Sequence, residues 1–166
     1  MDSVEHASLI TDEAIALAIE KGTALSMDIY VSDFILSEGE AAGILPASLE
    51  KERQVGRMQR ERFQAAVRAG ATIAYGTDAG VYPHGLNGNQ FAYMVEWGQT
   101  PMQAIQSSTV VNARLFDREG QIGVIKAGAF ADIIAVDEDP LANIRALEDI
   151  DFVMKNGKVY IDESTN

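Results

Sequence analysis

Short apolar runs alternate with longer amphipathic stretches along residues 1–117. The apolar runs cover residues 3–7, 23–30 and 71–78, and we predict a β-strand in each. The run at 71–78 stays apolar on both faces until it ends in a polar pair, which is typical of a strand buried between two layers. Strands separated by helical patterns indicate a parallel α/β fold.

Capping signals predict helices between these strands. Thr11 can cap a helix that ends at Gly22, a residue suited to the left-handed conformation that follows many helices. A long helix carrying both signs of charge is predicted for residues 47–69. The glycines and the proline of residues 33–46 indicate a loop before it.

Two more helices are predicted after the third strand. Residues 89–97 have helical periodicity. The segment Thr100-Pro101-Met102-Gln103 is a capping-box motif with proline at the first helical position. A helix should therefore start there and run to about Leu115.

The pattern changes in the last fifty residues, where glycines separate short segments. Residues 130–137 and 152–161 read as strands, and the second is interrupted by a hairpin turn at Asn156-Gly157. We predict two units, residues 1–117 and residues 118–166. The second is too small for an independent core, so it should pack on another part of the protein.

Charge and composition exclude several functions. The chain has 13 basic and 25 acidic residues and a net charge of −12, which argues against nucleic acid as a partner. It has no cysteine, so disulfides and thiolate metal sites are excluded. No apolar run approaches the roughly 18 residues of a membrane helix, and we expect no membrane partner. No signal peptide is visible at the start, and a cytoplasmic location is the default expectation.

Three side chains stand out as candidate chemistry: His6, Asp78 and His84, which include both histidines of the chain. His6 and Asp78 end predicted strands, and functional groups of parallel α/β folds gather at the carboxyl ends of strands. Imidazole and carboxylate together suit zinc, and a carboxylate beside a metal-activated water can take its proton. Simpler interpretations remain: His6 or His84 as surface residues, and Asp78 as the cap of a turn.

Six groups of residues stand in order along nearly the whole chain: 3–7, 76–80, 83–85, 100–105 with 112–114, 123–128 with 131–134, and 156–160. In this order they resemble the metal-dependent amidohydrolase superfamily. The resemblance is closest to the branch of imidazolonepropionase-like enzymes and Xaa-Pro or Xaa-Arg dipeptidases. It implies an α/β fold, namely strands six to eight of a TIM-type (β/α)8 barrel followed by part of a small β-sandwich domain.

The same resemblance implies roles for the candidate residues. His6 corresponds to the metal-ligand histidine at the end of barrel strand six. Asp78 corresponds to the aspartate at the end of strand eight, which ligates a metal and acts as general base and acid. His84 lies in a loop implied to contact substrate. The implied cofactor is a divalent metal, Zn²⁺ by preference, with one or two ions in the complete enzyme.

Several parts of the family's site are absent from this sequence. The His-x-His pair after strand one, the bridging lysine or glutamate of strand four and the histidine of strand five have no counterpart. A complete barrel needs about 200 residues or more, whereas residues 1–117 can hold roughly three of its eight units. We therefore expect a fragment of a longer protein, binding metal weakly and inactive by itself; one half of a split enzyme is the alternative.

The expected function of the complete protein is hydrolysis of amide or peptide C–N bonds by metal-activated water. The substrate would be a small molecule, either a dipeptide or a cyclic amide, and the complete enzyme could form a homo-oligomer. Two other interpretations stay open. One is a non-catalytic module completed by a partner chain that carries the other barrel half. The other is an unrelated α/β binding protein in which Asp78 only caps a turn.

Overall fold

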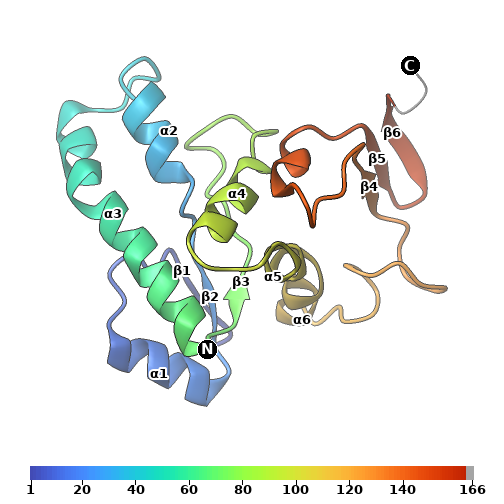
Figure 1. Cartoon of the computed structure of the whole chain (residues 1–166), viewed down its shortest axis with the longest axis horizontal. Helices are drawn as coiled ribbons and strands as arrows, with labels where there is room; N and C mark the ends of the chain where they lie inside the picture. Colours follow the sequence, from blue (N-terminus) through green and yellow to red (C-terminus); the bar gives the residue numbers. More distant parts are fainter. Residues whose placement is uncertain (164–166) are drawn as a thin grey trace.

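A computed structural model describes residues 1–163 and contains a three-stranded parallel sheet. Its strands are β1 (Ser3–Glu5), β2 (Ala24–Ser26) and β3 (Ile73–Ala74), in the order β1-β2-β3 (Figure 1). This confirms the predicted α/β class. All three strands are shorter than predicted. Beyond β2 and β3, the carbonyls of Met27 and Gly76 accept hydrogen bonds from one side chain, that of Gln90.

Two predicted helices are confirmed with their caps. In α1 (Asp12–Lys21) the Thr11 hydroxyl accepts a hydrogen bond from the Ala14 amide at 3.2 Å, and Gly22 takes the left-handed conformation. Helix α3 (Pro46–Ala69) is the longest element of the described chain. Helix α1 packs against both β2 and α3 (Figure 1).

The loop prediction for residues 33–46 was wrong over its first part. Helix α2 (Val31–Glu38) occupies it, although no side chain caps its first turn. Tertiary contacts stabilise this helix instead: Asp33 forms an ion pair with Arg60 of α3 at 2.7 Å, and Ser32 is buried beside Gly56. A Cβ atom at Gly56 would lie 2.9 Å from the Ser32 hydroxyl oxygen, so glycine permits the close approach of α2 and α3.

Helices α4 (Asn89–Glu96) and α5 (Pro101–Gln106) follow β3 as predicted, and both hydrogen bonds of the Thr100–Gln103 capping box are present. The predicted single helix to Leu115 contains one π-helical turn, η1 (Ser107–Val111), before α6 (Asn112–Leu115). The sequence pattern did not indicate this turn.

The end of the chain forms a separate antiparallel sheet of β4 (Ile133–Ala135), β5 (Phe152–Lys155) and β6 (Lys158–Asp162). Asn156 and Gly157 both have positive φ angles, 50° and 76°, and form the predicted hairpin turn. A short 3-10 helix, η2 (Ile144–Glu148), was not predicted. The predicted boundary after residue 117 stays a prediction, and residues 164–166 of the second unit lie outside the described residues.

One apolar core joins the elements. It combines Leu25 of β2 and Phe63 of α3 with Met94 of α4, and it extends to Leu147 of η2. The C-terminal unit therefore packs on the first through α4, as its small size required. Among residues 1–163, no helix is both long and apolar enough to cross a membrane.

Candidate metal centre

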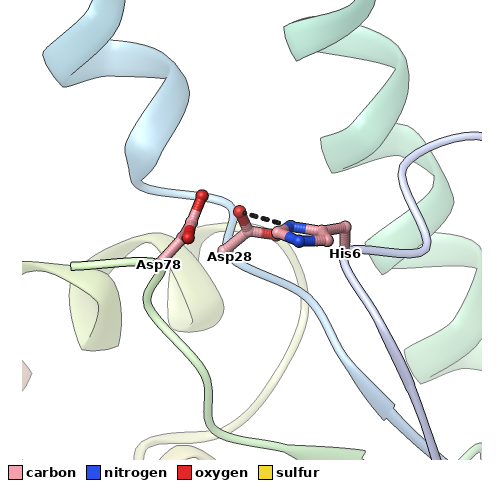
Figure 2. A group of neighbouring side chains, drawn as sticks. All are labelled: His6, Asp28 and Asp78. Carbon is pink, nitrogen blue, oxygen red and sulfur yellow. Dashed lines mark hydrogen bonds and ion pairs between the residues drawn. The ribbon is translucent and has the colours of Figure 1, made fainter. Parts of the chain in front are cut away.

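Three side chains meet at the carboxyl edge of the parallel sheet: His6 after β1, Asp28 after β2 and Asp78 after β3 (Figure 2). One ligand atom from each lies within 4.8 Å of the others. Among the described residues this is the one group of three or more such side chains close enough to hold a metal ion. The structure thus brings together His6 and Asp78, as strand ends of a parallel sheet should.

Two of these residues have an unusual backbone conformation. His6 and Asp78 have positive φ angles of 63° and 51°, a region that histidine and aspartate tolerate better than most side chains. Such conformations cost about 1–3 kcal/mol each and persist only where surrounding contacts enforce them. At His6 one such contact is visible, since the next amide, of Ala7, donates to the Glu5 carbonyl at 2.8 Å.

Asp28 was not among the predicted site residues. It lies two positions beyond β2, is 5% exposed, and sits between His6 and Asp78 in Figure 2. Its Oδ2 is 3.1 Å from His6 Nδ1, and its Oδ1 accepts a hydrogen bond from Gln59 Nε2 at 3.1 Å. One signal was present: Asp28 is the single acidic residue of the apolar run 23–30 and follows the middle strand at the same edge.

Three carboxylates raise the pKa of the His6 imidazole. The pKa of His6 is raised, first by the hydrogen bond to Asp28 and then by the negative charge of Asp28. Desolvation works in the opposite direction, and Asp78 and Glu5 add smaller increases. The surroundings of His6 therefore stabilise positive charge, whether it is carried by a proton or by a cation.

The Asp78 carboxylate remains available to a ligand. Within residues 1–163 no hydrogen bond to its side chain is present, so it does not cap the turn that follows it. Asp78 is exposed and, with His6 and Asp28, lines a pocket of about 180 Å³. Glu5, Ser26, Gly76 and Thr77 complete the lining.

His84 lies elsewhere in this arrangement. It is exposed in the loop after Asp78 and does not line the pocket. Its predicted contact with substrate stays a prediction.

The donor set fits a divalent metal ion but does not complete a catalytic site. One imidazole and two carboxylates are ligands that zinc accepts. A catalytic zinc uses three protein ligands and water, and here both oxygens of Asp28 already face partners within the protein. This leaves two side chains of the group that can bind a metal: His6, through its other ring nitrogen, and Asp78.

Comparison with known proteins places this geometry in a family. The model of the amidohydrolase family matches residues 1–160. An ochratoxinase from Aspergillus niger is 32% identical over 165 residues, covering 95% of this chain. The chain spans 33% of that protein's length.

Solved structures agree. A Xaa-Pro dipeptidase with methionine bound in its active site is 39% identical, with a TM-score of 0.89 over 97% of this chain and 40% of its own. A prolidase complexed with N-methylphosphonate-L-proline is 26% identical, with a TM-score of 0.88 over 98% of this chain and 40% of its own. The resemblance seen in the sequence motifs is confirmed, and the chain belongs to the amidohydrolase family.

Proposed function

We propose that this chain is part of a metal-dependent hydrolase that cleaves amide or peptide C–N bonds. The observation that carries the proposal is the meeting of His6, Asp28 and Asp78 at the carboxyl edge of a parallel sheet in a member of the amidohydrolase family. Similarity to a dipeptidase, a prolidase and an ochratoxinase supports this function over the non-catalytic module considered above.

In this proposal β1, β2 and β3 are strands six, seven and eight of a (β/α)8 barrel, and β4–β6 belong to a composite β-sandwich. Two features support it: the three strands are parallel neighbours in sequence order, and the C-terminal sheet is antiparallel and closed by a hairpin. The dipeptidase is about two and a half times as long as this chain, which covers 40% of it, so the remaining strands would come from outside these 166 residues.

His6 and Asp78 would hold the metal, with Zn²⁺ as the first choice for this mixture of imidazole and carboxylate. When bound, a metal of this kind would polarise the scissile carbonyl and lower the pKa of water, so that a hydroxide nucleophile is available at neutral pH. Asp78, which is exposed to the pocket and free of hydrogen bonds from the described chain, would take the proton of the attacking water. The same carboxyl group would then protonate the leaving nitrogen.

The substrate class is an amide of a small molecule, with a dipeptide favoured over a cyclic amide. The support is the similarity to the Xaa-Pro dipeptidase and the prolidase, both with TM-scores near 0.9. His84 would contact substrate from the loop after Asp78.

Metal binding tests the site itself. We expect the 166-residue chain to bind Zn²⁺ or Co²⁺ weakly, because it offers two free donors where a catalytic site uses three. His6→Asn and Asp78→Asn should each remove this binding, whereas His84→Asn should not. Calorimetric titration with Co²⁺ measures the affinity of the wild type and of each variant. Equal affinity in wild type and Asp78→Asn would overturn the proposed centre.

Hydrolysis is tested in a chimera in which this chain replaces the matched 40% of the Xaa-Pro dipeptidase. We expect dipeptide hydrolysis, and a loss of about 10³-fold or more in kcat for Asp78→Asn with metal still retained in part. A folded, metal-loaded chimera with no hydrolase activity would contradict the proposed reaction. So would unchanged activity in Asp78→Asn.

A further inference from the structure

Behind the metal-facing atoms, buried polar groups form a line from His6 into the protein interior. His6 Nδ1 is 3.1 Å from Asp28 Oδ2, and Asp28 Oδ1 accepts from Gln59 Nε2 at 3.1 Å. Gln59 Oε1 is in turn 3.3 Å from the Ser32 hydroxyl. Asp28, Gln59 and Ser32 are 5%, 4% and 1% exposed, so water does not compete for the contacts among these three residues.

The line joins three successive elements of the chain. Asp28 follows β2, Ser32 is on α2 and Gln59 is on α3. Gly56, one turn before Gln59, lets α2 and α3 approach closely enough for Ser32 to reach Gln59. The one hydroxyl hydrogen of Ser32 is shared between Gln59 Oε1 and a carboxylate oxygen of Glu52, so this end of the line is anchored in α3 twice.

Chemistry decides how each group is oriented. An ionised carboxylate only accepts hydrogen bonds, so Gln59 must turn its NH₂ group towards Asp28 and its carbonyl towards Ser32. Asp28 then has one oxygen occupied by Gln59 and presents the other to His6. The His6 nitrogen that faces this oxygen, Nδ1, must carry a hydrogen, which leaves the lone pair of a neutral ring on Nε2.

We propose that Asp28 and Gln59 are positioning residues that hold neutral His6 in the Nδ1–H tautomer, with Nε2 as the metal-binding nitrogen. The statement about Nε2 rests on the proposed function, whereas the statement about the tautomer does not. A carboxylate behind a metal-binding histidine is a common arrangement, and its loss typically lowers metal affinity by about 10–100-fold.

Nitrogen NMR of the 166-residue chain measures the tautomer directly, because ¹⁵N shifts distinguish protonated from unprotonated ring nitrogens. The chain has two histidines, so His84→Asn assigns the His6 signals. At a pH where the rings are neutral, we expect the Nδ1–H form of His6 to dominate by about tenfold in wild type. Asp28→Leu, which removes the acceptor, should reverse this ratio towards the Nε2–H form that free histidine prefers.

Two further variants separate positioning from a general structural role. Asp28→Asn should retain the Nδ1–H form, because its amide oxygen still accepts while Gln59 can rotate to match the new NH₂ group. Gln59→Met should reduce the ratio several-fold, because Asp28 loses its second partner. Gln54→Met is the matched control, since Gln54 is exposed on the same helix and its amide donates to Glu50 at 3.3 Å, far from Asp28 and His6 in the hydrogen-bond network.

Co²⁺ affinity is the second measurement, and it separates failure of the metal centre from failure of the positioning proposal. Gln59→Met should weaken Co²⁺ binding about tenfold, and Gln54→Met should leave it unchanged. A wild-type chain with the Nδ1–H tautomer but no Co²⁺ binding would contradict the metal centre and leave the positioning pair intact. An unchanged His6 tautomer in folded Asp28→Leu would overturn the positioning proposal. Loss of Co²⁺ binding in Asp28→Asn with the tautomer retained would overturn it too, by making Asp28 a ligand.

Discussion

Asn112 and Tyr75 exchange two hydrogen bonds that replace the pairing of a neighbouring strand. The Tyr75 amide donates to Asn112 Oδ1 at 3.1 Å, and Asn112 Nδ2 donates to the Tyr75 carbonyl at 3.0 Å. Asn112 follows the π-helical turn η1, which contacts β3. The pair therefore fixes the backbone just after β3, three residues before Asp78.

Replacing Asn112 by Leu should destabilise the chain by about 2 kcal/mol, because both backbone groups of Tyr75 lose their partner in a half-buried place. Urea denaturation measures the change. Arg114→Ala, two residues along the same helix, is the control, since its ion pair with Glu119 is exposed and should contribute less than about 1 kcal/mol. Equal effects of the two substitutions would contradict the anchoring role.

Gln90 connects the two strands that lead to the aspartates. Its fully buried amide accepts from the Tyr30 amide and donates to the Met27 carbonyl, both at 3.3 Å, and it also donates to the Gly76 carbonyl. Gln90→Leu should destabilise the chain by about 2 kcal/mol, since the Tyr30 amide and the Gly76 carbonyl each lose a hydrogen bond worth about 1 kcal/mol or more, whereas the Met27 carbonyl still accepts from the Ile29 amide. It should also weaken Co²⁺ binding more than Asn112→Leu does, because the segments after both β2 and β3, which carry Asp28 and Asp78, lose a hydrogen bond. Calorimetry of the two variants provides the comparison.

Features that depend on local sequence were predictable. The Thr11 cap, the Thr100–Gln103 box and the Asn156-Gly157 turn each depend on residues within four positions, and all three are confirmed. His6 and Asp78 could be placed at one edge because parallel strands end on the same side of a sheet.

Features that depend on distant partners were missed. Helix α2 has no capping side chain and is held by contacts such as the ion pair of Asp33 with Arg60 of the next helix, α3. Asp28 looked like part of a strand, and its partner Gln59 lies 31 positions away. No periodicity of either segment indicates such a pairing.

The stability of the chain should depend on pH through His6. Hydrogen bonding to Asp28, and then its charge, raise the pKa of His6 above its usual value near 6.5, so the folded chain binds this proton more tightly than the unfolded chain. The stabilisation is complete below the unfolded pKa and is lost as the pH rises through the folded pKa. It should stay below about 1 kcal/mol, because the His6 side chain is 58% exposed and water screens the pair.

Urea midpoints between pH 5.5 and 8.5 check this, with a fall expected across the upper part of the range. His6→Gln should flatten that fall, and His84→Gln should leave it in place because His84 is outside the ion pair. A fall of the same size in wild type and His6→Gln would assign the pH dependence to other groups.

Gly76 leaves the space that Ser26 fills beside the pocket. A Cβ atom at position 76 would lie 2.2 Å from the Ser26 hydroxyl oxygen and 3.6 Å from Ser26 Cβ. Gly76→Ala should therefore destabilise the chain by about 1–3 kcal/mol, because the buried Ser26 hydroxyl must move to admit the new methyl group. Removing the hydroxyl should relieve the clash, so Ser26→Ala combined with Gly76→Ala should recover most of the loss.

Denaturation of the four members of this double-mutant cycle measures the coupling. Additive effects of the two substitutions would show that the contact with Ser26 does not set the requirement for glycine, and the cause would then lie in the backbone at Gly76 itself.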